Sequence, residues 1–112
     1  MLKESDFIKI RVTVPSGEAA EKVRLAMGEA GAGVQGNYDY CSCSFPVTGR
    51  FRPLAGANPA IGSVGKPEEV QEEIIEMLCH KDKVEEVIAA LKKAHPYEEP
   101  AIDIIPKLEI EN

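Results

Sequence analysis

The chain has 112 residues, a length typical of one domain, and we expect residues 1–112 to form a single domain. Its formal net charge is −6, and an acidic surface repels phosphate backbones, so nucleic acid is excluded as a partner. No apolar run approaches the roughly 18 residues of a membrane span, and the N-terminal segment lacks the apolar stretch of a signal peptide. Three cysteines suit a reducing compartment better than a disulfide framework. We therefore expect a cytoplasmic protein with no membrane partner.

The first predicted elements are a strand and a helix. Residues 7–14 alternate apolar and polar side chains, the pattern of a half-buried strand. Ser16 is suited to cap a helix that ends at Gly31 or Gly33. The apolar stripe of this helix consists of Ala19, Val23, Ala26, Met27 and Ala30.

A second strand is expected over residues 34–45, because its tyrosines and phenylalanine favour strands. Side chains alternate along a strand, so Cys41 and Cys43 would share one face. Two thiols placed in this way suit small core positions, and they also suit the beginning of a soft metal site. Residues 46–67 are punctuated by proline and glycine, and we expect a long loop there.

The second half of the chain repeats the order of the first. Residues 69–79 have strand character, and Asp82 with Glu85 forms a capping-box pattern at the start of a helix. Pro96 ends that helix, and residues 101–105 form the last strand, which Leu108 and Ile110 either extend or follow as an edge strand.

The resulting β-α-β-β-α-β order predicts an α+β protein with a ferredoxin-like fold, an antiparallel sheet with two helices on one face. The other sheet face needs a cover as well, because Ile74, Leu78 and Ile104 are expected to point there. Self-association is the simplest source of that cover. We therefore expect a homo-oligomer.

Residues 31–36 read GAGVQG and match the G-x-G-x-x-G pattern of dinucleotide sites. Such a site needs its glycines between a strand and the following helix, whereas these glycines follow a helix. We interpret them as a helix end and a turn.

The predicted loop has a distinct charge. It contains no acid, and Arg50 and Arg52 flank Phe51 within it. This combination suits a small anionic ligand or a protein partner, because arginine makes forked contacts and glycine allows close approach of the backbone. The alternative is a solvated loop whose arginines pair with acids of a neighbouring subunit.

The run HPYEEP, residues 95–100, joins the last helix to the last strand. His95 near Glu98 or Glu99 is suited to bind a divalent ion or to transfer protons. The interpretation we favour is a rigid turn, in which two prolines fix the backbone, His95 closes the helix and Tyr97 packs.

Several of these segments together resemble a known family. Residues 36–38 (GNY), 48–53 (TGRFRP), 56–59 (GANP) and 94–100 (AHPYEEP) are similar to the PII/CutA-like domain inserted into YqfO-type members of the Nif-three-like family. The chain resembles a stand-alone version of that insert from its first strand to Ile105. The resemblance implies a ferredoxin-like fold, a trimer by analogy to PII and CutA proteins, and a loop in the place of the PII effector loop. The parent family's dinuclear metal ligands lie outside the insert, and no residue set here matches the PII nucleotide site or the CutA copper site.

The prediction is a non-catalytic, oligomeric binding or regulatory module with an unknown ligand. No enzyme is expected, because the polar groups form no acid–base–nucleophile set. The loop 46–67 and the HPYEEP turn would form the site near a subunit interface. The expected ligand-binding residues are Gly49, Arg50, Phe51, Arg52, Pro53, Asn58, Pro59 and Tyr97.

Two alternatives stay open. The first is a divalent-metal-binding protein, in which the ligands are His95 with Glu98, or Cys41 with Cys43. A divalent metal is the one cofactor that the sequence suggests. The second alternative is a purely structural assembly module.

Overall fold

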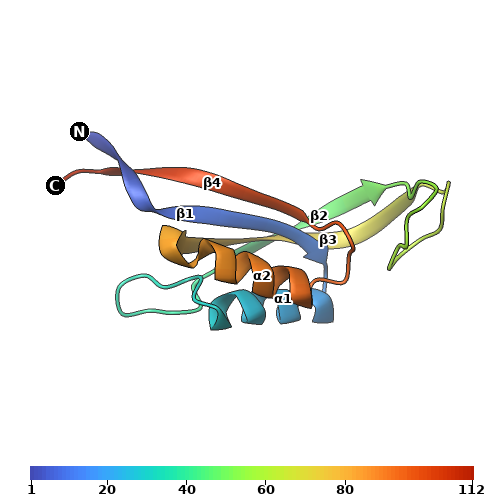
Figure 1. The fold of residues 1–112 in the computed structure, drawn as a ribbon, viewed down its shortest axis with the longest axis horizontal. Helices are drawn as coiled ribbons and strands as arrows, with labels where there is room; N and C mark the ends of the chain where they lie inside the picture. Colours follow the sequence, from blue (N-terminus) through green and yellow to red (C-terminus); the bar gives the residue numbers. More distant parts are fainter.

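The computed structural model describes all residues, 1–112, and contains one four-stranded antiparallel sheet with two α-helices (Figure 1). The strands pair in the order β2-β3-β1-β4, which is the order of a ferredoxin-like fold. The predicted fold class is therefore confirmed. The elements are β1 Leu2–Pro15, α1 Glu18–Glu29, β2 Cys43–Phe51, β3 Glu68–His80, the 3-10 helix η1 Lys81–Lys83, α2 Val84–Ala94 and β4 Ala101–Ile110.

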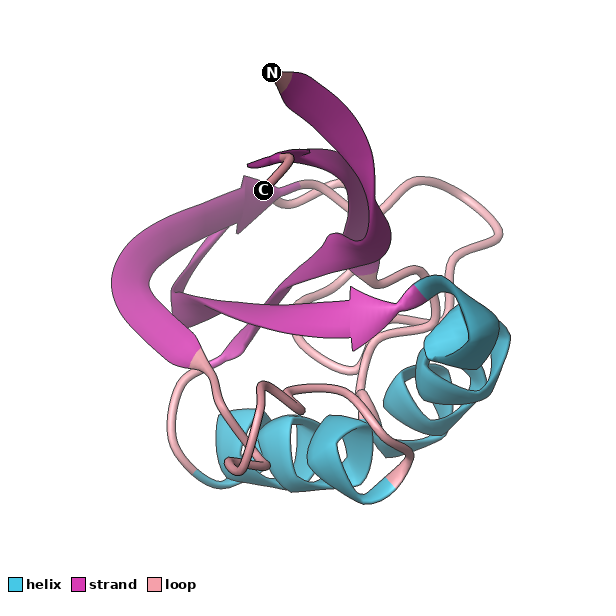
Figure 2. Ribbon diagram, turned by 90° about the vertical axis from the view of Figure 1, so that its left-hand side faces the viewer, coloured by secondary structure: helices cyan, strands magenta, loops and turns pink.

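The hydrophobic core lies between the helices and one face of the sheet, and Figure 2 shows both helices on the same side. The alternation predicted for the first strand is confirmed, because every second residue of β1 from Ile8 to Val14 is buried. The core is completed by Ile75, Met77 and Cys79 of β3, by Ala20, Val23 and Met27 of α1, by Val87 and Leu91 of α2, and by Ala32.

Strand β1 begins earlier than expected, because its start pairs with the end of β4 beyond the helices. The pairing shifts register between Glu4 and Ile8, so β1 bulges there. Ser5 lies in the bulge, is buried, and its hydroxyl oxygen accepts a hydrogen bond from the Phe7 N–H at 3.0 Å. Pro46 of β2 and Pro106 of β4 lie on edge strands, where a missing N–H is tolerated, and Pro15 is the last residue of the central strand β1.

The strand predicted over residues 34–45 is wrong, because most of that segment is irregular and β2 begins only at Cys43. A turn reverses the chain between Gln35 and Tyr38, whose backbone groups pair with one another at 2.9 and 3.0 Å. Tyr40 has a φ of 52° and packs on α1, where its hydroxyl donates to Glu29 at 2.7 Å. Tyr40 therefore holds a loop that is folded back onto the helix.

The long loop is also shorter than predicted, spanning residues 52–67 and not 46–67. Residues 46–51 belong to β2, whose outer edge has no partner and so tolerates proline and glycine.

The helix caps also differ from the prediction. Helix α1 is preceded by Gly17 and has no side-chain cap. At the start of η1, His80 Nδ1 accepts the Asp82 N–H at 3.1 Å, so His80 and not Asp82 is the cap. The glycines after α1 do end the helix, as predicted, since Gly31 and Gly33 have φ angles of 115° and 81°.

The molecule is elongated, with extents of 53 × 26 × 24 Å. The β2–β3 hairpin and loop 52–67 extend to one end, and the two chain ends lie together at the other (Figure 1). The Glu111 N–H donates to the Met1 carbonyl there, at 2.8 Å. Neither helix is long and apolar enough to cross a bilayer.

The close packing of Tyr40 on α1 makes Gly28 a sensitive position. A Cβ at Gly28 would lie 2.2 Å from Tyr40 Cδ1, so Gly28→Ala should lower the free energy of unfolding by about 1–3 kcal/mol despite the better helix propensity of alanine. Urea denaturation measures the change. In a Tyr40→Gly background the same Gly28→Ala substitution should stabilise the protein by about 0.5–1 kcal/mol. Equal effects in both backgrounds would contradict the packing explanation.

Candidate functional site

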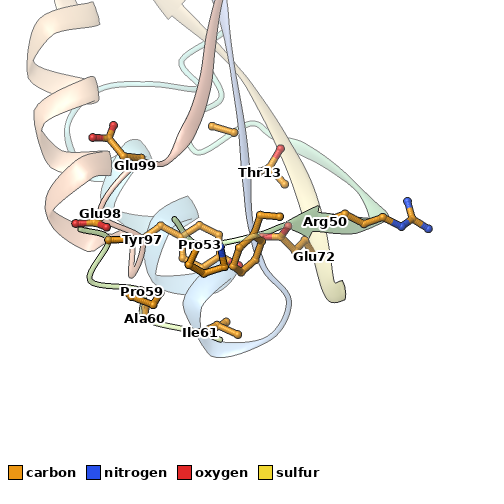
Figure 3. A pocket seen from close by; sticks show the side chains of 13 residues that line it. Thr13, Arg50, Pro53, Pro59, Ala60, Ile61, Glu72, Tyr97, Glu98 and Glu99 are labelled. Carbon is orange, nitrogen blue, oxygen red and sulfur yellow. The ribbon is translucent and has the colours of Figure 1, made fainter. Parts of the chain in front are cut away.

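A pocket of about 310 Å³ lies between loop 52–67, the end of β2 and the HPYEEP turn (Figure 3). Its polar and charged lining comes from Thr13, Arg50, Glu72, Tyr97, Glu98 and Glu99. Its apolar walls are formed by Phe51, Pro53, Ala57, Pro59, Ala60 and Ile61. Segments that are far apart in the sequence therefore meet at one cavity.

Three contacts hold the loop and the turn around this pocket. The Asn58 N–H donates to the Glu98 carboxylate at 2.9 Å, which links the loop to the turn. The rings of Phe51 and Tyr97 meet edge to face, with centroids 5.9 Å apart. Within the loop, the Gly65 N–H donates to the Pro53 carbonyl at 2.8 Å. The pocket is thus closed by backbone and side-chain contacts of different elements.

His95 anchors the turn to the sheet. It is buried, its Nε2 lies 2.8 Å from the Thr13 carbonyl oxygen, and its Nδ1 accepts the Tyr97 N–H at 3.1 Å. These two partners require the neutral tautomer with the proton on Nε2. Burial lowers the pKa of His95, against smaller opposing effects of the Thr13 carbonyl and Glu72. Both ring nitrogens are therefore occupied in holding the backbone.

Glu72 lies in the floor of the pocket and is only 4% exposed. Its Oε2 has no hydrogen-bond partner, and the hydroxyl of Tyr97 is likewise buried without a well-aligned partner. The pKa of Tyr97 is raised far above its ordinary value, first by burial and then by the neighbouring Glu72 carboxylate. A polar floor with unused hydrogen-bonding capacity thus lies beneath apolar walls.

Gly49 leaves the space that Glu72 occupies. A Cβ at Gly49 would lie 1.5 Å from Glu72 Oε1, so any other residue at position 49 would displace the carboxylate. The φ angle of Gly49 lies outside the left-handed region, and the close approach therefore explains the glycine better than a turn would.

The structure separates the predicted ligand-binding residues into groups. Arg50, Phe51, Pro53, Pro59 and Tyr97 line the pocket. In Figure 3 the Arg50 guanidinium points away from the other lining side chains, and its Nε lies 3.6 Å from an exposed Glu69 carboxylate.

The other predicted residues have supporting positions. Asn58 holds the loop through its backbone, Gly49 makes room for Glu72, and Arg52 is exposed and not part of the lining. Sequence reasoning missed Glu72, because an acid within a strand of mixed pattern gives no sign that its side chain is buried.

The candidate metal ligands are not brought together. The Cys41 Sγ lies 3.7 Å from the Asp39 carbonyl oxygen and the Cys43 Sγ 3.8 Å from Glu76 Oε1. The prediction that both cysteines share a strand face is wrong, because Cys41 precedes β2. His95 and Glu98 are engaged with backbone groups, as described above. No cluster of three or more His, Cys, Asp or Glu side chains is arranged to hold a metal ion.

Comparison with known proteins gives two kinds of relatives, while no family model matches the chain. The chain is 49% identical over 100 residues to the GTP cyclohydrolase 1 type 2 homolog of Mycobacterium tuberculosis and 48% identical over 98 residues to that of Bacillus subtilis. These matches cover 89% and 88% of this chain but 26% of each relative, so the chain spans about a quarter of their length.

Solved structures agree with this result. A Bacillus cereus protein related to NIF3 superposes with a TM-score of 0.77 at 40% identity, covering 96% of this chain and 26% of that chain. The divalent cation tolerance protein CutA of Archaeoglobus fulgidus superposes with a TM-score of 0.65 at 26% identity, covering 90% of this chain and 83% of that chain.

The sheet order, the two helices on one face and these likenesses define a CutA/PII-like domain of ferredoxin-like fold. More particularly, the chain matches the CutA/PII-like quarter of the NIF3-related GTP cyclohydrolase 1 type 2 homologs, and the resemblance found in its sequence is confirmed.

The buried, neutral state of His95 predicts a pH dependence of stability. The pKa of His95 is lowered in the folded protein, whereas the unfolded chain has a value near 6.5, so the stabilisation is complete above about pH 6.5 and is lost as the pH falls toward the folded pKa. Urea unfolding between about pH 7.5 and 5.5 should show the free energy of unfolding decreasing by at most about 1.4 kcal/mol per pH unit. His95→Gln should flatten the curve. The same slope in the unmodified protein and in His95→Gln would contradict the assignment.

Proposed function

We propose that the chain is a non-catalytic binding or regulatory module of CutA/PII type, that its ligand site is the pocket beneath loop 52–67, and that it works as a homo-oligomer. A trimer is proposed by analogy with the PII and CutA proteins. A cytoplasmic location remains a prediction. The observation that carries the proposal is the pocket itself, with a volume at the lower end of the range of small-molecule sites.

The composition of the pocket supports a ligand site. Ligand pockets are mostly apolar with a few polar groups that fix orientation, and here apolar walls surround the buried Glu72 and Tyr97. The loop that covers the pocket is long, and its contact with the turn through Asn58 and Glu98 is a single exposed hydrogen bond. A ligand therefore has a route into the cavity when this contact opens.

A non-catalytic role is supported by how the histidines are used. His95 is held by two backbone groups, and His80 Nδ1 accepts the Asp82 N–H at 3.1 Å. These are the only histidines of the chain. The name GTP cyclohydrolase 1 type 2 homolog describes relatives about three quarters of whose length this chain does not match, so we do not transfer that activity to it.

Self-association is supported by the sheet face opposite the helices. Phe45, Ile74, Leu78 and Ile105 share this face through the strand register, and no helix covers it. The expectation that Ile104 points there is wrong, because Ile104 pairs with the buried Ile10 and lies on the helix side of the sheet. Phe45 is 41% exposed. Glu72 lies on the same face of β3 as Ile74, two residues away, which would place the pocket near the boundary between subunits.

Native mass spectrometry tests the proposed assembly. The unmodified protein should appear as a trimer at micromolar concentration, and Phe45→Asp should shift it toward monomer, because the substitution places a charge on the open apolar face. Leu25→Asp is the matched control: Leu25 is 45% exposed on α1, away from the open face, and its substitution should leave the trimer intact. A monomeric unmodified protein would refute the assembly.

A pocket-filling variant tests the ligand site. Ala60 lines the cavity, so Ala60→Trp should occupy it while leaving the core untouched. In a thermal-shift screen of small metabolites, at least one compound should raise the melting temperature of the unmodified protein but not of Ala60→Trp. Binding at 100 times Kd is worth about 2.7 kcal/mol, a readily measured shift for a chain of this size. If no compound distinguishes the two proteins, the pocket is not the ligand site.

A further inference from the structure

The floor of the pocket holds a carboxyl group that pairs with no cationic side chain of the protein. Glu72 is 4% exposed, and none of the ion pairs of the molecule includes it. Its Oε2 has no hydrogen-bond donor. The neighbouring Tyr97 hydroxyl acts on the carboxylate, but it carries no positive charge. A buried carboxylate without a cationic partner is costly, and proteins retain such groups mainly where a partner is supplied.

The remaining charges around the pocket have the same sign. Glu98 and Glu99 also line it, and the only cationic residue in the lining is Arg50. The Arg50 guanidinium is directed outward and pairs with Glu69, so it contributes its aliphatic stem to the cavity (Figure 3). The pocket therefore favours positive charge, and it would repel the anionic ligand that the arginines suggested in the sequence.

The walls indicate the rest of the ligand. Phe51, Pro53, Pro59 and Ile61 present apolar surface, and Phe51 and Tyr97 present aromatic rings, which attract cations as well as apolar groups. The cavity of about 310 Å³ suits a compact molecule.

Building on the proposed function, we infer that the ligand is a small organic ammonium ion, a protonated amine on a compact apolar body. Its N–H groups donate to the Glu72 carboxylate, next to the Tyr97 hydroxyl. Its apolar body lies against Phe51 and Pro53. Charge-assisted hydrogen bonds gain strength where water is excluded, so Glu72 supplies the charge selectivity and the walls supply the burial.

Three probes of one shape and different charge test this inference on the unmodified protein. Benzylamine, benzyl alcohol and benzoate are titrated separately, and chemical shifts of the backbone amides are followed by NMR at neutral pH. Benzylamine should shift the amides of Phe51, Ala57 and Tyr97, with a Kd at least about tenfold lower than that of benzyl alcohol. Benzoate should leave these amides unshifted.

A Glu72 variant then tests whether this residue causes the preference for the ammonium ion. Glu72→Gln retains the shape and removes the charge, so the preference for benzylamine over benzyl alcohol should disappear. Glu73→Gln is the matched control on the adjacent position of β3, whose side chain points to the other face of the sheet, and it should preserve the preference. An unchanged preference in Glu72→Gln overturns the role of Glu72. If Glu72→Gln does not fold, the three probes on the unmodified protein decide the question.

The outcomes separate this inference from the proposed function. Binding of benzyl alcohol or benzoate as tightly as benzylamine overturns the ammonium ligand and leaves the pocket as a ligand site. If no probe changes the amide chemical shifts, the inference is also overturned. The thermal-shift screen against Ala60→Trp then decides whether the pocket is a ligand site at all.

Discussion

The site depends on the hydrogen bond between His95 Nε2 and the Thr13 carbonyl, which attaches the turn after α2 to the end of the central strand β1. The same imidazole receives the Tyr97 N–H, so one buried side chain fixes the turn on two sides. Tyr97 is thereby placed against Phe51, and Glu98 is placed to receive the Asn58 N–H. The side of the pocket that the turn forms, and its contacts with Phe51 and the loop, therefore depend on this anchor.

A second constraint is the space beside Gly49. The absence of a side chain in β2 lets the Glu72 carboxylate lie within the sheet surface rather than in solvent. A glycine weakens a strand, and β2 tolerates it because the residues on both sides of Gly49 pair with β3. A small residue on one strand thus determines where a charge of the next strand is buried, and the electrostatics of the pocket depend on that placement.

The sequence predicted the architecture well, and the reason is local. The apolar face of each element can be read from its spacing, which alternates from Ile8 to Val14 and is helical from Val84 to Leu91. Because these apolar faces must be buried against one another, few arrangements of the strands and helices are possible. The prediction failed at residues 34–45, where tyrosines favoured a strand by propensity. Tyr40 instead packs on Gly28 of α1, a contact between residues twelve positions apart that strand propensity does not register.

By itself the sequence determined the order of elements, the apolar faces and the two motifs that meet at the pocket, because these depend on short-range pattern. Only the tertiary structure decided the character of the site. It directs Arg50 outward toward Glu69, engages both nitrogens of His95 with backbone and buries Glu72 beneath the loop. The direction and burial of a side chain depend on neighbours brought close by folding, and residue type alone does not specify them.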